Sequence, residues 1–249
     1  MAPAPHGPDR VAIVTGGTRG IGAAISRRLV ARGIRVVAVY RGDTATAEAL
    51  EKELDGLSAR RVDLDDPLAC VALVESVVAE YGRLDHLVNN AGLLLEARSV
   101  DTGIEDWDRT VAVNLSAAFH LARTAIPVMR DAGYGRIVNI SSVTAVMGSP
   151  SEAAYGAAKA GLHGLTRSLA RETARAGITV NTVVPGVFDT DMTASMPEKT
   201  REAIRRMIPV GRRGNPDELA AAVEFLLGDD AAYCTGSVLT VDGGLGMGG

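Results

Sequence analysis

Short apolar runs rich in Val and Ile alternate along this chain with longer segments in which apolar and polar residues follow the period of a helix. Runs that are apolar at nearly every position are typical of strands buried on both faces of a parallel sheet. We expect seven strands, within residues 10–16, 34–40, 59–64, 84–92, 136–142, 178–186 and 237–244. The helical pattern falls between them, at residues 20–33, 44–54, 66–82, 105–130, 152–176 and 216–228.

Strand and helix alternate over almost the whole chain, and this order predicts the α/β class. The specific expectation is a Rossmann fold, in which a doubly wound parallel sheet of seven strands carries helices on both faces. No change of composition and no repeat divides the 249 residues, so a single domain is expected over residues 10–249. Residues 1–9 are rich in Pro and lack the apolar core of a signal peptide, which predicts a disordered tail.

Composition narrows the classes of function. A formal net charge of −4 and an aromatic content of 4% argue against nucleic-acid binding, which needs clustered Lys and Arg and aromatic stacking platforms. No apolar run approaches the ~18 residues of a membrane span. Cys70 and Cys234 lie far apart, as expected of small buried side chains in a reducing compartment. We therefore expect a soluble, cytoplasmic protein. No metal site is expected, because no ligand-like spacing joins His6, His86, His120 and His163.

A glycine-rich stretch directly follows the first predicted strand and opens the first helix; it reads TGGTRGIG. At such a turn, glycine lets the backbone bend tightly and approach a pyrophosphate, which the N-terminus of the helix stabilises. A phosphate-loop nucleotidase would need Lys and Ser or Thr at the helix start, where this chain has Ile21 and Gly22. The turn therefore predicts a dinucleotide site, with candidate contacts at Gly16, Thr18, Arg19, Gly20, Ile21 and Gly22.

The end of the second strand indicates which dinucleotide binds. A site selective for NAD usually has a carboxylate there, which accepts hydrogen bonds from the ribose hydroxyls. Here the strand ends at Tyr40 and Arg41 follows, so a guanidinium is available for a 2′-phosphate. Arg19 in the glycine turn is a second candidate contact with that phosphate. We therefore expect NADP(H), with Asp43 as the nearest acid that could oppose this preference.

Tyr155 and Lys159 lie four residues apart in the helical segment at 152–176. Residues at i and i+4 share one face of a helix, so the ammonium is expected to lower the pKa of the phenol. Such a phenol can give a proton to a ketone that is being reduced. Ser142, at the carboxyl end of the fifth strand, lies where parallel sheets bind ligands and can hydrogen-bond the same carbonyl. Its neighbour Ser141 is expected to point to the opposite face of the strand.

Taken together, these motifs resemble the short-chain dehydrogenase/reductase family. The resemblance extends from residue 10 to about residue 245 and is carried by TGGTRGIG, NNAG at 89–92, Asn114, Ser142, YGAAK at 155–159 and PG at 185–186. It implies four catalytic residues, which are Asn114, Ser142, Tyr155 and Lys159. By the same resemblance, Lys159 would also bind the nicotinamide ribose, and Asn114 would support a water that leads protons to Lys159.

The resemblance also implies further contacts with the cofactor. Asp63 would meet the adenine amino group, residues 90–92 would line the adenosine ribose, and Gly186 with Thr190 would meet the nicotinamide carboxamide. The asparagines of NNAG are also open to a structural role, in which they brace neighbouring strands. Beyond the glycine turn, the candidate contacts are Tyr40, Arg41, Asp63, Leu64, Asn90, Ala91, Gly92, Tyr155, Lys159, Pro185, Gly186 and Thr190.

Within the family, the chain is most similar to the 3-oxoacyl-[acyl-carrier-protein] reductases. This similarity implies that a β-ketoacyl thioester, carried on an acyl carrier protein or on CoA, is reduced with NADPH to the 3-hydroxyacyl thioester. The segment from Phe188 to about Gly211 is expected to be a lid over the substrate, because it is charged and bounded by Gly and Pro. The similar stretches are GRIVNISS, AAYGAAKAGLHGLTRSLARE, GITVNTVVPGVFDTDMT, IPVGRRGNPDELAAAVEFLL and YCTGSVLTVDGG.

One stretch departs from this pattern. Family members often have basic residues just before the fifth strand, which would suit an acidic carrier, but this chain has Asp131, Ala132 and Gly133 there. Other arginines could supply the positive charge, namely Arg171, Arg175, Arg205 and Arg206.

Two alternatives remain open for the activity. A related enzyme could act on another ketone or alcohol, such as a sugar, a steroid or a polyketide intermediate. A non-catalytic protein could instead sense NADP(H) on the same fold. For the assembly, the small-residue face of the segment at 152–176 and the glycine-rich end at 232–249, together with the resemblance, indicate a homotetramer.

Overall fold

The computed structural model describes residues 10–189 and 198–247 and has one parallel sheet at its centre. Within these residues the sheet has seven strands, in the order β3-β2-β1-β4-β5-β6-β7. Each neighbouring pair runs parallel, which confirms the predicted doubly wound sheet. In chain order the strands are β1 Val11–Thr15, β2 Arg35–Tyr40, β3 Leu57–Arg61, β4 His86–Asn89, β5 Gly135–Ile140, β6 Ile178–Pro185 and β7 Val238–Val241.

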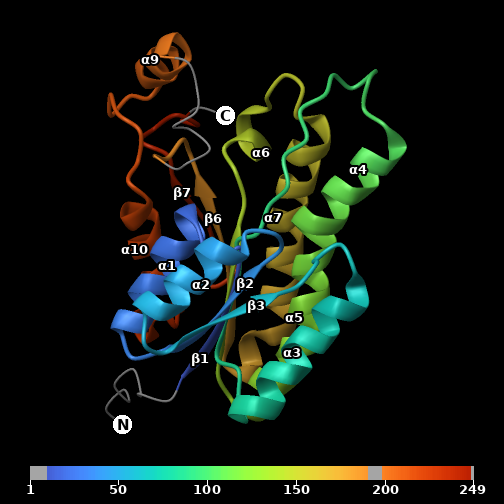
Figure 1. Ribbon diagram of the computed structural model, residues 1–249, viewed down its shortest axis with the longest axis vertical. Coiled ribbons are helices and arrows are strands. Elements are labelled where there is room, and N and C mark those ends of the chain that lie inside the picture. Colours follow the sequence, from blue (N-terminus) through green and yellow to red (C-terminus); the bar gives the residue numbers. More distant parts are fainter. Residues whose placement is uncertain (1–9, 190–197, 248–249) are drawn as a thin grey trace.

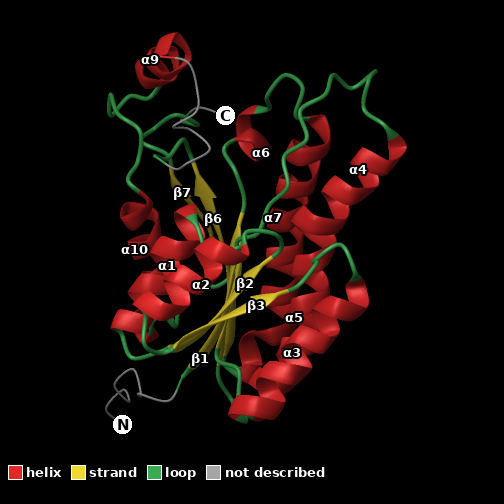
Figure 2. Cartoon of the chain, viewed as in Figure 1, coloured by secondary structure: helices red, strands yellow, loops and turns green. Residues whose placement is uncertain are grey.

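Helices cover both faces of the sheet (Figures 1 and 2). One face carries α1 (Gly20–Ala31), α2 (Thr44–Glu53) and α10 (Pro216–Leu227). The other face carries α3 (Pro67–Tyr81), α5 (Ala117–Asp131) and α7 (Ala153–Thr173). The shorter elements are α4 Ile104–Val111, the π-helical turn η1 Ala112–Ser116, α6 Thr144–Met147, α9 Glu198–Met207, and the 3-10 turns Ala174–Ala176 and Asp229–Ala231.

The central strands are buried on both sides, which explains why apolar residues occur on both faces of β1. In β1, Ala12 and Val14 belong to the core that includes α1 and α10, whereas Val11 and Ile13 belong to the core that includes α3 and α5. Alternate residues of a strand point to opposite faces, so one continuous apolar run supplies two cores. The order of the strands reverses between β1 and β4, and ligands of open α/β sheets bind at the carboxyl ends of the strands beside such a point.

Strand β3 lies at the edge of the sheet and is displaced from the prediction. It was expected within residues 59–64, but it spans Leu57–Arg61, where Leu57 pairs with Val36 of β2. The backbone N–H of Val62 still donates to the carbonyl of Tyr40, and the chain then turns toward α3. Pairing with β2 therefore decides where this strand begins, and the apolar pattern does not show it.

The predicted helix at 105–130 is divided into α4, the π-helical turn η1 and α5. Together, the helical stretch Ile104–Asp131 is the one part of the described chain that is long and apolar enough to cross a membrane, with 33% of its most apolar window buried. Its buried residues, such as Leu121 and Met129, pack in the core between α3 and the sheet. The stretch therefore serves here as a covering helix of the sheet.

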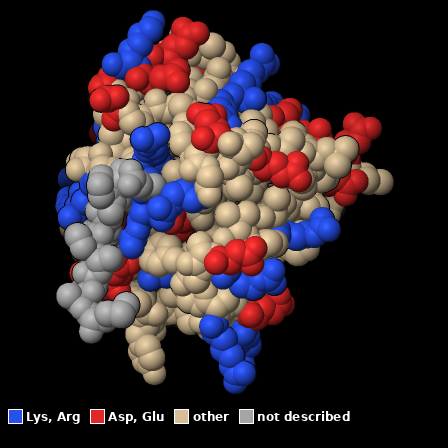
Figure 3. All heavy atoms as spheres, turned by 90° about the horizontal axis from the view of Figure 1, so that it is seen from below, with Lys and Arg blue, Asp and Glu red and all other residues tan. Residues whose placement is uncertain are grey.

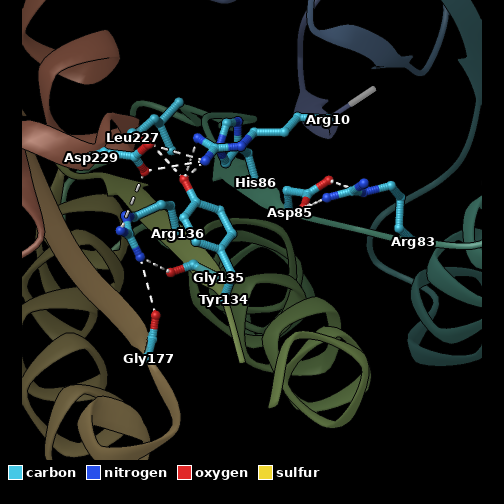
Figure 4. Close-up of polar contacts among 10 residues, drawn as sticks. All are labelled: Arg10, Arg83, Asp85, His86, Tyr134, Gly135, Arg136, Gly177, Leu227 and Asp229. Atoms are coloured by element: carbon cyan, nitrogen blue, oxygen red, sulfur yellow. Dashed lines mark hydrogen bonds and ion pairs between the residues drawn. The ribbon is translucent and has the colours of Figure 1, made fainter. Parts of the chain in front are cut away.

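A cluster of polar side chains closes the amino-terminal edge of the sheet, opposite the carboxyl ends of the strands (Figure 4). We call Arg10, His86, Tyr134, Arg136 and Asp229 the amino-edge cluster. Arg10 donates to the Tyr134 hydroxyl at 2.7 Å and to both oxygens of Asp229 at 3.1 and 3.2 Å. The guanidinium carbons of Arg10 and Arg136 lie 4.2 and 4.3 Å from the centroid of the Tyr134 ring. The cluster thus joins the start of β1, β4 and β5 to the turn after α10.

Seen from this edge, basic and acidic side chains are interspersed with uncharged surface (Figure 3). This face has no broad field of positive charge, in keeping with the net charge of −4.

Candidate active site

The glycine turn between β1 and α1 lies at the carboxyl edge of the sheet. Gly16 and Gly20 have φ values of +62° and +51°, a region that favours glycine. A Cβ atom on Gly22 would lie 1.9 Å from the carbonyl oxygen of Gly16, so no larger residue fits there. Arg19, at the N-cap of α1, provides no side-chain cap to the first N–H groups of the helix. The turn therefore combines a close backbone approach with an uncapped helix N-terminus, the two features that bind a phosphate group.

The end of β2 places Tyr40 and the exposed Arg41 beside this turn. Arg61 of β3 donates through Nε to the carbonyl oxygen of Arg41 at 2.9 Å, which fixes the backbone there. Asp43, the acid that could oppose binding of a 2′-phosphate, instead caps α2. Its carboxylate accepts from the backbone N–H of Thr46 at 3.1 Å and from the Thr46 hydroxyl at 2.8 Å. The hydrogen bonds from Thr46 lower the pKa of Asp43, and the charge of Arg19 adds to this effect.

The NNAG motif ties the ends of neighbouring strands together. Asn89 donates to the side-chain oxygen of Asn139 in β5 at 2.8 Å, and Asn90 donates to the carbonyl of Thr15 in β1 at 2.8 Å. The Thr15 hydroxyl in turn accepts from the backbone N–H groups of Asn90 and Ala91. The structural role of these asparagines is therefore confirmed.

Asn114 is 2% exposed in the π-helical turn η1, where its side chain holds the segment that follows NNAG. Its amide nitrogen donates to the carbonyls of Leu93 at 2.8 Å and Thr110 at 2.9 Å, and its oxygen accepts from the N–H of Leu93 at 3.2 Å. A Cβ atom on Gly92 would lie 3.2 Å from this oxygen and 3.6 Å from Nζ of Lys159. Asn114 and Gly92 thus lie beside Lys159.

Ser142, Tyr155 and Lys159 come together at the carboxyl end of β5. The Ser142 hydroxyl accepts from the backbone N–H of Thr144 at 3.2 Å and forms a hydrogen bond with the half-buried phenol of Tyr155. The Lys159 ammonium is fully buried, lies 5.8 Å from the centroid of the Tyr155 ring and donates to the carbonyl of Ile140 at 2.8 Å. A proton donor, a hydrogen-bonding hydroxyl and a cation thus share one site.

The two titratable groups of this site are shifted mainly by burial. Burial lowers the pKa of Lys159 to about 8. Burial also raises the pKa of Tyr155, the charge of Glu152 adds to this, and the hydrogen bond with Ser142 acts against it. The predicted lowering of the phenol pKa by the neighbouring ammonium is therefore wrong for this structure, because desolvation outweighs any effect of Lys159. A phenol with a raised pKa is protonated at neutral pH, as a proton donor must be.

Ser141 and His163 are two contacts of this site that the sequence did not reveal. The Ser141 hydroxyl donates to the carbonyl oxygen of Lys159 at 2.9 Å and lies 2.8 Å from Nε2 of His163. The expectation that Ser141 and Ser142 point to opposite faces is wrong, since both hydroxyls reach α7. The alternation of a strand no longer applies, because β5 ends at Ile140. The one sequence signal was the i, i+4 spacing of Lys159 and His163 on a helix.

The remaining predicted contacts lie along the same edge of the sheet. Leu64 is 7% exposed and Asp63 is exposed, both in the loop after β3, while Pro185 and Gly186 lie at the end of β6. A Cβ atom on Gly186 would lie 2.7 Å from Asp242, so a larger residue would displace the C-terminal turn. Thr190 lies outside the described residues, as do residues 1–9, the predicted tail.

The predicted lid at 188–211 is partly described, and both of its ends are anchored. Phe188 is 5% exposed in the core and pairs with Gly214, and Ile208 is 3% exposed. The N–H of Val210 donates to the carbonyl of Gly243 at 3.1 Å. Between these anchors, α9 has no buried residue among those described and lies beyond the carboxyl edge of the sheet (Figure 1). The lid remains a prediction, with Phe188 and Ile208 as its fixed points.

Comparison with known proteins shows which family the chain resembles over almost its whole length. Residues 16–246 match the model of a family described as "Enoyl-(Acyl carrier protein) reductase". The chain is 45% identical over 237 residues to the acetoacetyl-CoA reductase of Rhizobium meliloti, covering 95% of this chain and 98% of that protein. It is 42% identical over 243 residues to the 3-oxoacyl-[acyl-carrier-protein] reductase FabG of Salmonella typhimurium, covering 96% and 98%. The FabG protein of Thermotoga maritima is 40% identical over 242 residues, covering 95% and 97%.

The chain therefore belongs to the short-chain dehydrogenase/reductase family and is an oxidoreductase of that family.

The fold family implies a nicotinamide dinucleotide as cofactor, and the residues present fit one. A Cβ atom on Gly16 would lie 3.0 Å from Nδ2 of Asn90, and one on Gly22 would lie 1.9 Å from the carbonyl oxygen of Gly16, so glycine at these two positions allows the tight backbone turn next to the uncapped N-terminus of α1. Within residues 10–189 and 198–247, no group of three or more His, Cys, Asp or Glu could hold a metal ion.

Proposed function

We propose that the chain reduces the keto group of a β-ketoacyl thioester to a 3-hydroxyacyl thioester, with NADPH as the reductant. The observation that carries this proposal is the group of Ser142, Tyr155 and Lys159 beside the glycine turn. Relatives that are 40–45% identical over almost their full length bear the names of two such thioester reductases, which supports the same chemistry.

Each residue of the site has a different role in the reduction. A nicotinamide bound at the glycine turn would supply the hydride for the carbonyl carbon. Tyr155 gives its phenolic proton to the carbonyl oxygen, and the Ser142 hydroxyl donates a hydrogen bond to the same oxygen and holds it toward the phenol. Lys159, whose pKa is about 8, is protonated at neutral pH and favours the phenolate that this transfer leaves. By the family resemblance, it also binds the nicotinamide ribose and receives protons through a water that Asn114 supports.

NADPH is favoured over NADH by the charges around the end of β2. Arg41 and Arg19 offer two guanidinium groups to a 2′-phosphate, and a guanidinium binds phosphate through paired hydrogen bonds. The carboxylate of Asp43 is occupied by Thr46 and so does not compete for the ribose hydroxyls. The adenine end would then lie against Asp63 and Leu64, as the resemblance implies.

The carrier of the acyl chain is a separate question, because the relatives are named for both CoA and carrier-protein substrates. Arg205 and Arg206 of α9 each form an ion pair with Glu202, which reduces the positive charge available to an acidic carrier. Arg171 in the last turn of α7 and Arg175 in the 3-10 turn that follows are exposed and remain the better candidates for docking. Charge reversal of Arg175 is expected to raise KM for a carrier-bound substrate and to leave KM for the CoA substrate unchanged. An unchanged KM for both would remove the docking role.

The experiment that tests the activity measures oxidation of NADPH and of NADH with acetoacetyl-CoA, for the wild type and for Tyr155→Phe. We expect turnover with NADPH that falls at least about a hundredfold in the variant, the contribution typical of a positioned general acid. Crotonyl-CoA, an enoyl thioester without a keto group, is the matched control and is expected not to react. Turnover of crotonyl-CoA alone would point to enoyl reduction, and turnover of only a sugar or steroid ketone would replace the substrate class. NADPH binding without turnover of any ketone would favour a sensing role.

A further inference from the structure

Two consecutive residues at the end of β5 hold Lys159 at both of its ends. The carbonyl oxygen of Ile140 accepts from Nζ of Lys159 at 2.8 Å, and the hydroxyl of Ser141 donates to the backbone carbonyl of Lys159 at 2.9 Å. Lys159 and Ser141 are each 2% exposed, so water does not compete for these bonds. The side chain and the backbone of one helical residue are therefore fixed to one point of the sheet.

His163 completes this arrangement one turn further along α7. Its Nε2 lies 2.8 Å from the Ser141 hydroxyl oxygen. A serine hydroxyl has a single proton, and that proton is directed to the carbonyl of Lys159. Nε2 of His163 must therefore carry a proton and donate it to the serine oxygen. The result is a directed chain of hydrogen bonds from His163 through Ser141 to Lys159.

A second polar contact holds the same helix on the same strand, but away from the site. Asn139 of β5 donates to the hydroxyl of Thr166 at 2.8 Å, and Thr166 contacts the hydroxyl of Thr182 in β6 at 2.7 Å. Thr166 lies two helical turns beyond Lys159 and does not touch it. The attachment of α7 to the sheet thus has a part that contacts Lys159 and a part that does not, and the two can be removed separately.

We propose that Ser141 and His163 are positioning residues for Lys159, which hold its ammonium at the height that proton transfer from Tyr155 requires. This inference rests on the proposed function, since it assigns the pair to the same reduction. Neither residue touches the reacting atoms, and both act through the backbone carbonyl of Lys159. Loss of the pair would let α7 shift on β5, so that the ammonium loses its place beside Ile140 and water reaches it.

The kinetic test compares Ser141→Ala and His163→Leu with His163→Gln, which keeps an N–H donor at a similar reach. We expect kcat to fall about five- to tenfold in the first two variants, the effect of one ordinary hydrogen bond, with KM for the thioester nearly unchanged. His163→Gln is expected to retain most of the wild-type kcat. Thr166→Val is the structural control, and it should lower the melting temperature but leave kcat near that of the wild type. An equal loss of kcat in Thr166→Val would mean that the pair only stabilises the helix, and would overturn the proposal.

A second readout does not depend on turnover. The chain has three lysines, Lys52, Lys159 and Lys199, so the ¹³Cε signal of Lys159 can be assigned with Lys52→Arg and Lys199→Arg. We expect the titration midpoint of Lys159 to rise toward that of an exposed lysine in Ser141→Ala, because water then solvates the ammonium. In Thr166→Val it should not move. An unchanged midpoint in Ser141→Ala would also overturn the proposal. A wild type that reduces no ketone would remove the proposed function, whereas the midpoint would still test whether the pair holds the ammonium in place.

Discussion

The lysine of the candidate active site is charged only over a limited range of pH. Burial lowers the pKa of Lys159 to about 8, so its ammonium exists below that pH and its neutral amine above it. Tyr155 is shifted in the opposite sense, and its phenol stays protonated through the same range. The proton donor therefore remains available at pH values at which its cationic neighbour has already been lost.

This difference predicts how kcat for the reduction depends on pH above neutrality. We expect kcat for reduction of acetoacetyl-CoA to be constant from about pH 6 and to fall as the pH rises through about 8, since loss of the ammonium charge removes support for the phenolate. The measurement is kcat at saturating NADPH across the pH range. Lys159→Arg keeps the positive charge at all these pH values and should lack this fall in kcat, although its kcat will be lower. A wild-type profile that stays flat above pH 9 would contradict the role of the ammonium.

The proposed preference for NADPH also depends on single residues. Replacing Arg41 with Ala removes a charge-assisted contact with the 2′-phosphate, so KM for NADPH should rise about tenfold while KM for NADH changes little. Arg130→Ala is a matched control, because Arg130 is exposed at the C-terminal end of α5, where Asp131 is its ion-pair partner. Equal changes in KM for the two cofactors in Arg41→Ala would exclude Arg41 as the residue that selects between them.

Among the elements, the amino-edge cluster connects four segments that are far apart in sequence. Burial alone would raise the pKa of Asp229, but the hydrogen bonds and charge of Arg10, with smaller effects of Tyr134 and Arg136, outweigh it and lower that pKa. A carboxyl group with a lowered pKa stabilises the folded state above its unfolded pKa and loses this effect as the pH falls through the folded value. The cluster is therefore expected to stabilise the fold at neutral pH and to weaken in acid.

Replacement of Asp229 by Asn tests the contribution of the amino-edge cluster to stability. At pH 7 we expect the free energy of unfolding in urea to fall by about 1 to 3 kcal/mol, the range for a hydrogen bond to a charged group. The difference from the wild type should shrink as the pH is lowered below the ordinary pKa of an aspartate. Asp131→Asn is the control, since Asp131 is 78% exposed and pairs with Arg130 at 3.6 Å, and it should change stability by less than about 0.5 kcal/mol. A difference for Asp229→Asn that grows in acid would contradict the assigned sign.

For the whole molecule, exposed apolar side chains on two separate helical surfaces support the proposed homotetramer. Trp107 of α4 and Phe119 of α5 are 43% and 42% exposed, and Phe225 of α10 is 48% exposed on the opposite side of the sheet. Two different self-complementary surfaces on one chain can assemble four copies with two-fold symmetry. We propose that these surfaces form the two interfaces of the tetramer. We also propose that the protein works in the cytoplasm, where thiols such as Cys70 stay reduced.

Light scattering tests this assembly. The wild type is expected to have four times the mass of the 25.9 kDa chain, and Phe225→Arg is expected to yield a smaller species, because a charge placed in an apolar interface is costly. Lys52→Glu is the control for a change of charge, because Lys52 is exposed on α2, which packs against the edge strand β3, and it should leave the mass unchanged. A wild-type monomer would overturn the tetramer.

Much of this molecule could be predicted from local patterns along the sequence. The apolar runs of β1 and β6, the glycine turn at Gly16–Gly22 and the i, i+4 pair of Tyr155 and Lys159 depend on neighbouring residues and on the periods of strand and helix. These patterns were sufficient for the class of fold, and they also predict the candidate cofactor turn and the candidate catalytic side chains. The edge strand β3 was displaced because its ends follow from pairing with β2, which no local period records.

Only the tertiary structure decided the state of those side chains. The pKa of Tyr155 is raised because α7 is packed against β5, and Lys159 turns to Ile140 because the strand ends there with a free carbonyl in reach. Ser141 contacts His163 because α7 is packed against the end of β5. These effects arise from contacts between residues about 20 positions apart in the chain. The distances between such residues in space depend on how the helix packs on the sheet. The sequence by itself therefore determined which groups are present, and packing determined their protons and their partners.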